Sequence, residues 1–152
     1  MKLKPILLLL TALITSSVAA QEAKNAIGAD LIGSDISARF YINENTSIRA
    51  DLGFVLLDVN QVDFQLSYVA YKSPEAFEVR FGTLRPYFAP GILLSADDIT
   101  DDLSFGLIFP GGLEYIFEEA PVEVFMDIGP YVFIETNQLL GLSSSFGLRL
   151  RL

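Results

Sequence analysis

Apolar and polar residues alternate through most of the chain, and the alternation is clearest in its last ten residues, SSSFGLRLRL. Successive side chains of a β-strand point to opposite faces of the sheet, so this period of two predicts a strand. One face is apolar and carries Phe146, Leu148, Leu150 and Leu152. The other face is polar and cationic, and it carries Ser145, Gly147, Arg149 and Arg151.

The same alternation recurs in earlier segments, which short polar turns and loops separate, including Asn43–Thr46, Ser95–Asp102 and Glu135–Gly141. No segment outside the first twenty residues shows sustained helical periodicity. The spacing is typical of an up-and-down meander of about eight strands. The segments are Ala26–Ile32, Ile36–Ile42, Ser47–Leu56, Val62–Lys72, Phe77–Phe81, Leu84–Leu94, Leu103–Phe117, Val122–Ile134 and Ser143–Leu152.

A strand that runs to the last residue needs a partner, and pairing with the first strand would close the sheet. The fold class predicted is therefore all-β, an antiparallel up-and-down barrel of about eight strands. An interior of this width is filled by side chains, so no open pore is expected.

Two kinds of barrel fit the pattern. In a membrane barrel the apolar face meets lipid and the charged face fills the lumen. In a soluble barrel the faces invert, and Phe88, Phe105 and Phe109 would line a cup for a lipid or another apolar ligand. A hydrophobic content of 51% against 19% charged residues favours the membrane barrel. A third alternative is a channel for apolar compounds, with a lateral gap near Pro86, Pro90 and Pro110.

The start of the chain resembles a secretory signal, with Lys2 and Lys4 before the apolar run Ile6–Ile14. We expect Met1–Ala20 to be removed and residues 21–152 to form the barrel. The remaining 19 acidic and 8 basic residues give a net charge of −11, which disfavours nucleic acid as a partner. The chain has no cysteine, and therefore neither a disulfide framework nor a lipid-attachment cysteine.

The charged residues predict an ionic network in the lumen, because each falls on the polar face of its segment. Simple hairpin registers bring Arg39 opposite Asp51 and Asp127 near Arg149, and they bring Arg151 close to Glu114 and Glu123. Several residues oppose the pattern: Ile108, Phe125 and Tyr131 fall on the polar face, and Pro86, Pro90, Pro110 and Pro130 lie within strands, where bulges near Pro110–Gly112 would absorb part of the irregularity. The predicted network comprises Arg39, Arg49, Asp51, Asp63, Arg85, Glu114, Glu123, Asp127, Arg149 and Arg151.

The last strand also resembles the C-terminal assembly signal of bacterial outer-membrane proteins, through Ser145, Gly147, Leu150 and Leu152. That signal usually ends in an aromatic residue, where this chain has Leu152. Leu84–Phe88, Phe109–Phe117 and Pro121–Ile134 are similar to segments of a family of small outer-membrane barrels first noticed in spirochaetes. The resemblance implies a small OmpX/OmpA-type barrel in the bacterial outer membrane, with both termini in the periplasm. Its partners would be outer-membrane lipid and the barrel assembly machinery, together with an unknown extracellular protein.

Catalysis is not expected, because the chain contains neither histidine nor cysteine. No cofactor is expected either, since the main ligands of zinc and haem are missing. The one weak candidate for a metal site is an acidic loop whose spacing lacks the order of a calcium-binding loop. Its carboxylates are Asp97, Asp98, Asp101 and Asp102.

Overall fold

The computed structural model describes residues 25–54, 61–71, 77–79, 81–97, 102–134 and 140–152, so the predicted signal sequence lies outside the described residues. The described part of the chain contains no helix long and apolar enough to cross a bilayer. It forms eleven strands: β1 Asn25–Asp30, β2 Asp35–Asn43, β3 Thr46–Phe54, β4 Gln61–Tyr71, β5 Phe77–Val79, β6 Gly82–Phe88, β7 Gly91–Asp97, β8 Asp102–Ile108, β9 Gly111–Phe117, β10 Val122–Phe133 and β11 Leu140–Arg151.

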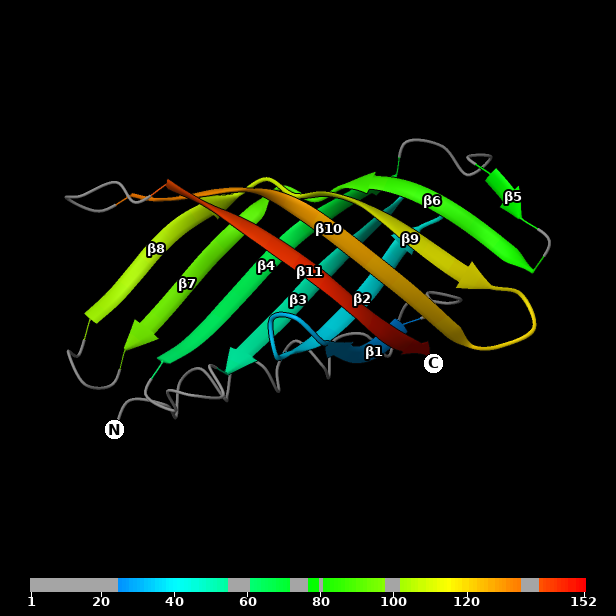
Figure 1. Cartoon of the computed structure of the whole chain (residues 1–152), viewed down its shortest axis with the longest axis horizontal. Helices are drawn as coiled ribbons and strands as arrows, with labels where there is room; N and C mark the ends of the chain where they lie inside the picture. Colours follow the sequence, from blue (N-terminus) through cyan, green and yellow to red (C-terminus); the bar gives the residue numbers. More distant parts are fainter. Residues whose placement is uncertain (1–24, 55–60, 72–76, 80, 98–101, 135–139) are drawn as a thin grey trace.

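Eight of these strands close into a ring in which every neighbouring pair is antiparallel. The order is β1–β2–β3–β4–β7–β8–β10–β11, and β11 pairs back with β1 (Figure 1). The prediction of an all-β antiparallel barrel of eight strands, closed by its first and last strands, is confirmed. The predicted loops Ser95–Asp102 and Glu135–Gly141 are both too long. Strand β7 continues to Asp97, β8 begins at Asp102, and β11 begins at Leu140.

The strands β6 and β9 continue the walls of β7 and β8 beyond short interruptions that contain Pro90 and Pro110. The pairs Phe88 with Gly111 and Gly91 with Ile108 belong to one register, so no residue is inserted between them. The bulge predicted near Pro110–Gly112 is therefore wrong. Beyond the end of β4, the short strand β5 pairs with the same edge of β6.

Backbone hydrogen bonds cross the sheet at the prolines. Ala89 N donates to Pro110 O at 2.9 Å, and Phe109 N donates to Pro130 O at 3.0 Å. On the other side of this wall, Tyr68 N donates to Pro90 O at 2.9 Å. Each of these three prolines lacks a donor but still accepts a bond, so the wall is joined at Pro90 and Pro110, two of the positions where the sequence had suggested a lateral gap.

The barrel is strongly sheared, as its paired residues show. A path of paired residues from Ala26 passes through Arg39, Arg49, Ser67, Gly91, Ile108 and Tyr131 and reaches Gly141 on β11. The direct partner of Ala26 on β11 is instead Arg151, ten residues further along the chain. Such a stagger requires tilted strands, which Figure 1 shows crossing the barrel obliquely.

The two faces of the sheet differ sharply in exposure. Phe88, Phe105 and Phe109 are on the outer surface, with 48%, 38% and 41% of their area exposed, so the expected apolar cup lined by these rings is wrong. Other large apolar side chains share this surface: Ile27, Leu31, Ile32, Ile36, Ile42, Tyr68, Val79, Phe81, Leu103, Leu113, Met126, Ile128, Ile134, Leu140, Leu142, Phe146, Leu148, Leu150 and Leu152.

The interior combines charged residues with a few apolar ones. Phe125 and Ile108, which the alternation places on the polar face, are both buried. Close to them in register, Val69, Tyr71, Tyr87 and Ala89 form a small core. Most of the remaining interior is polar, and it contains the site described next.

Candidate functional site: a buried ionic cluster

Three arginines and four carboxylates form one connected group inside the barrel, called here the ionic cluster. Arg39 extends from β2, Arg49 from β3 and Arg149 from β11, and none is more than 1% exposed. Because these side chains alternate along their strands with less buried apolar neighbours, the strand geometry alone directs them inward. The four carboxylates, all buried, belong to Asp51, Glu114, Glu123 and Asp127.

Two ion pairs cross the barrel between strands that are not neighbours. Arg39 of β2 pairs with Glu114 of β9, and Arg49 of β3 pairs with Asp127 of β10. Burying a charge is costly unless it is paired and hydrogen-bonded, so each cross-barrel pair ties opposite walls together.

The other ion pairs lie along the wall. Arg49 Nε is 2.7 Å from Asp51 Oδ2 on its own strand. Arg149 Nη1 is 3.1 Å from Glu123 Oε1, its direct neighbour across β10 and β11, and 3.8 Å from Glu114 Oε1. Arg149 therefore links the two glutamates.

Hydroxyl groups complete the cluster. Tyr87 donates to Asp127 Oδ2 at 2.6 Å, and Arg39 Nη1 donates to the Tyr71 hydroxyl at 2.6 Å. Ser37 donates to Asp51 and accepts from Arg149 Nε at 2.9 Å. Its hydroxyl therefore connects the ion pair of Arg49 and Asp51 with that of Arg149 and Glu123. The alternation also places these hydroxyl residues inward, although the predicted network contains charged residues alone.

Arg149 also packs on an aromatic ring. Its guanidinium carbon lies 3.6 Å from the centroid of Phe125, which adds a cation–π contact to the ion pairs. The Phe125 ring occupies the space that a Cβ on Gly147 would fill, and Phe125 and Gly147 are register partners on β10 and β11. Phe125 is thus an inward apolar residue because it supports Arg149.

The predicted hairpin pairings are wrong in detail. Arg39 lies opposite Arg49, and Asp51 lies opposite Ser37, because only two residues, Glu44 and Asn45, separate β2 from β3. The register also shifts between Tyr41 and Asn43.

The last hairpin differs in the same way. Asp127 lies opposite Ser145 rather than near Arg149. Arg151 donates to the carbonyl oxygens of Phe117, at 3.0 Å, and Ala120, at 3.4 Å, in place of Glu123 and Glu114.

Two other predicted members lie apart from the ionic cluster. Arg85 is the register partner of Glu114, but its guanidinium donates to Glu44 O and lies 3.9 Å from the Tyr71 ring centroid. Asp63 lines a cavity near the β1–β2 turn, together with Gly33 of that turn.

The residues of the resemblance to an assembly signal occupy both faces of β11. Ser145 is half-buried and Gly147 is buried, whereas Leu150 and Leu152 are on the outer surface. A Cβ on Gly147 would collide with the carbonyl oxygen of Ala29 on β1, so only glycine lets these two strands approach this closely.

The acidic loop lies largely outside the described residues, including Asp98, Asp101 and the side chains of Asp97 and Asp102. Among the residues that the structure does describe, no group of three or more carboxylates is arranged to hold a metal ion.

Comparisons with protein-family models, curated proteins and solved structures found no match to this chain. The fold and the ionic cluster are therefore the basis for any functional argument.

Proposed function

We propose that this protein is an integral outer-membrane β-barrel with a structural or surface-interaction role and no catalytic activity. The observation that supports the proposal is the inversion of its two faces. Leu148 and Leu150 are more than 40% exposed, while Arg149 between them is fully buried. An outer surface that is this apolar is unfavourable in water but is favourable in contact with the acyl chains of a membrane.

The ionic cluster gives a role to the inside of this barrel. The cross-barrel pairs between Arg39 and Glu114 and between Arg49 and Asp127 support an interior that is filled by side chains. Side chains that fill an eight-stranded barrel leave no aqueous channel, which argues for a rigid membrane anchor rather than a pore.

The resemblance of residues 145–152 to an assembly signal supports export to the bacterial outer membrane and folding by the assembly machinery there. With the termini in the periplasm, the turn at residues 31–34 between β1 and β2 would face the exterior, because one strand separates it from the N-terminal end. An extracellular protein would meet the barrel at that end.

Fractionation of cells that make the protein tests the proposal. We expect it in the outer-membrane fraction, and we expect its band on a denaturing gel to shift in mobility only after boiling. Release into the soluble periplasmic extract would contradict the proposal. An unchanged mobility after boiling of the membrane fraction would contradict a closed barrel.

A further inference from the structure

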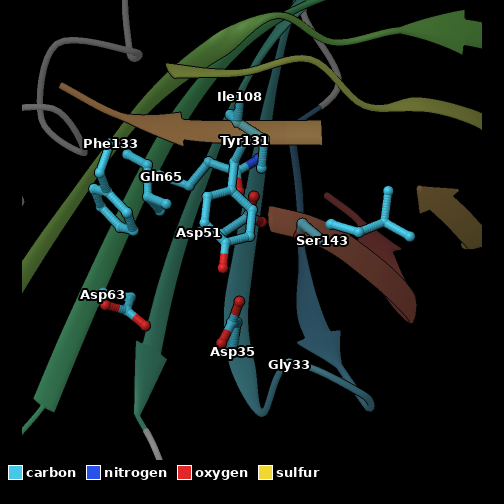
Figure 2. Close-up of a pocket in the computed structure, with 11 residues that line it drawn as sticks. Gly33, Asp35, Asp51, Asp63, Gln65, Ile108, Tyr131, Phe133 and Ser143 are labelled. Atoms are coloured by element: carbon cyan, nitrogen blue, oxygen red, sulfur yellow. The ribbon is translucent and has the colours of Figure 1, made fainter. Parts of the chain in front are cut away.

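A cavity of about 290 Å³ lies inside the barrel, between the ionic cluster and the end opposite the termini. Its lining comes from seven strands and the β1–β2 turn, which contributes Gly33; Gln65 of β4 and Tyr131 of β10 are among the strand residues (Figure 2). Its volume approaches the range of about 300 Å³ and above that small-molecule sites occupy.

One wall of the cavity is acidic. Asp35, Asp51 and Asp63 line it from three adjacent strands, and no lysine or arginine is among the lining residues that the structure describes. Asp35 and Asp63 flank Gly53 in register, and a Cβ on Gly53 would come within 2.5 Å of Asp35 Oδ1. Figure 2 shows the Asp35 and Asp63 side chains on this wall.

The carboxylates are placed against the usual rule for a stable sheet. Asp35 lies directly opposite Asp30 across β1 and β2, and like charges so placed destabilise the pair. Asp30 has a structural reason for its position, since its Oδ1 accepts hydrogen bonds from the amides of Ile32, Gly33 and Phe146. That reason does not extend to Asp35. A local arrangement that costs stability is expected where function requires it.

The facing wall is apolar and aromatic. The rings of Tyr131 and Phe133 meet edge to face, with centroids 5.6 Å apart, and Leu93 and Ile108 line the same part of the cavity. Each ring lies opposite a glycine across its strand pair, Gly141 for Tyr131 and Gly106 for Phe133. Because a Cβ on either glycine would crowd the ring, these glycines make room for an aromatic surface inside the barrel.

We propose that this cavity binds a small organic cation. The carboxylates of Asp35 and Asp63 attract its ammonium group. The Tyr131 and Phe133 rings pack against its apolar body, and their faces attract the cation. A bare metal ion would use only the acidic wall, and the described residues contain no group of three or more carboxylates arranged to hold one. Access from the cell exterior rests on the proposed function, whereas the binding itself does not.

Titration of the detergent-solubilised full protein with phenethylammonium, followed by NMR at mildly alkaline pH, tests this inference. We expect saturable shifts at the Tyr131 and Phe133 amides, and much weaker shifts with 2-phenylethanol or with methylammonium. Equal binding of 2-phenylethanol would overturn the role of the carboxylates. Equal binding of methylammonium would overturn the role of the rings, and no saturable shift would overturn the site.

The variants Asp35→Asn and Asp63→Asn should each weaken binding about fivefold, since each removes one charge near the ammonium group. Asp35→Asn also removes the repulsion with Asp30, so it should fold at least as well as the parent protein. The matched control is Glu119→Gln, an exposed turn residue, which should leave binding unchanged. Unchanged binding in both aspartate variants would contradict the proposal.

The same samples separate this inference from the proposed function. Heat-modifiable mobility without binding of phenethylammonium would support the proposed membrane barrel and contradict the cation site. Saturable binding by a protein recovered from the soluble extract would keep the site and reject the membrane role.

Discussion

Arg39 and Arg49 lie directly opposite each other on β2 and β3, and both are buried inside the barrel. Two like charges in this position would destabilise the strand pair if the strands were considered alone. Each arginine is instead paired across the barrel, Arg39 with Glu114 and Arg49 with Asp127. The β2–β3 pair is therefore compatible with these arginines only when the barrel is closed.

Removal of one partner should expose that dependence. Glu114→Gln leaves Arg39 buried without its countercharge, and we expect about 3–5 kcal/mol less stability toward urea in detergent or lipid. The control Glu119→Gln changes an exposed turn residue and should shift stability by less than about 0.5 kcal/mol. If both variants unfold at the same urea concentration as the parent, the ionic cluster does not hold the barrel together.

The close approach of β1 and β11 at Gly147 gives a second prediction. A methyl group there meets Ala29 O and the Phe125 ring, so we expect Gly147→Ala to lower the folded fraction, at a cost of about 1–3 kcal/mol. Gly111→Ala is the matched control, since its Cβ would have no neighbour nearer than 4.0 Å. The folded and unfolded bands on an unboiled gel measure the folded fraction of both variants. Equal folded fractions would show that β1 and β11 do not approach closely enough at Gly147 to exclude a methyl group.

A charge on the outer surface distinguishes a lipid environment from water. Leu148→Arg should cost about 2–4 kcal/mol near the bilayer midplane and reduce the yield of folded barrel in vesicles. Asn45→Arg introduces the same residue in an exposed turn and should have little effect. Equal yields would mean that Leu148 does not face acyl chains.

Hydrogen exchange tests the continuity of the proline-containing wall. The amides of Ala89 and Phe109 donate to the carbonyls of Pro110 and Pro130, so they should exchange as slowly as other barrel amides. Exposed turn residues such as Glu119 provide the fast reference. Rapid exchange at Ala89 and Phe109 would reopen the lateral gap that the channel alternative requires.

Alternation in the sequence predicted the strands and divided their side chains into two faces, because it depends only on the period of two along each strand, whereas the high hydrophobic content indicated which face is inside. The alternation put Arg149 and Phe146 on opposite faces without knowledge of any contact, and in the structure Arg149 is buried while Phe146 is exposed. Registers were less predictable, since the two-residue turn at Glu44 and Asn45 moves Arg39 from Asp51 to Arg49.

The cross-barrel pairs were beyond local reasoning. Arg39 reaches Glu114 because the tilt and stagger of the closed ring bring β2 and β9 to face each other. The registers of β2 and β9 with their neighbouring strands do not predict this contact. Phe125 appeared to violate the pattern for a different reason, because its contact with Arg149 depends on the register between the neighbouring strands β10 and β11.

The central claim, that the apolar face meets acyl chains and the polar face fills the lumen, can be tested with single tryptophans, since the chain has none. Phe109→Trp places the probe on the outer wall and Tyr131→Trp places it inside the barrel. In vesicles of brominated lipid, the indole fluorescence of the Phe109→Trp variant should be strongly quenched and that of the Tyr131→Trp variant nearly unaffected. Equal quenching of the two variants, or quenching of the Tyr131→Trp variant alone, would contradict the account.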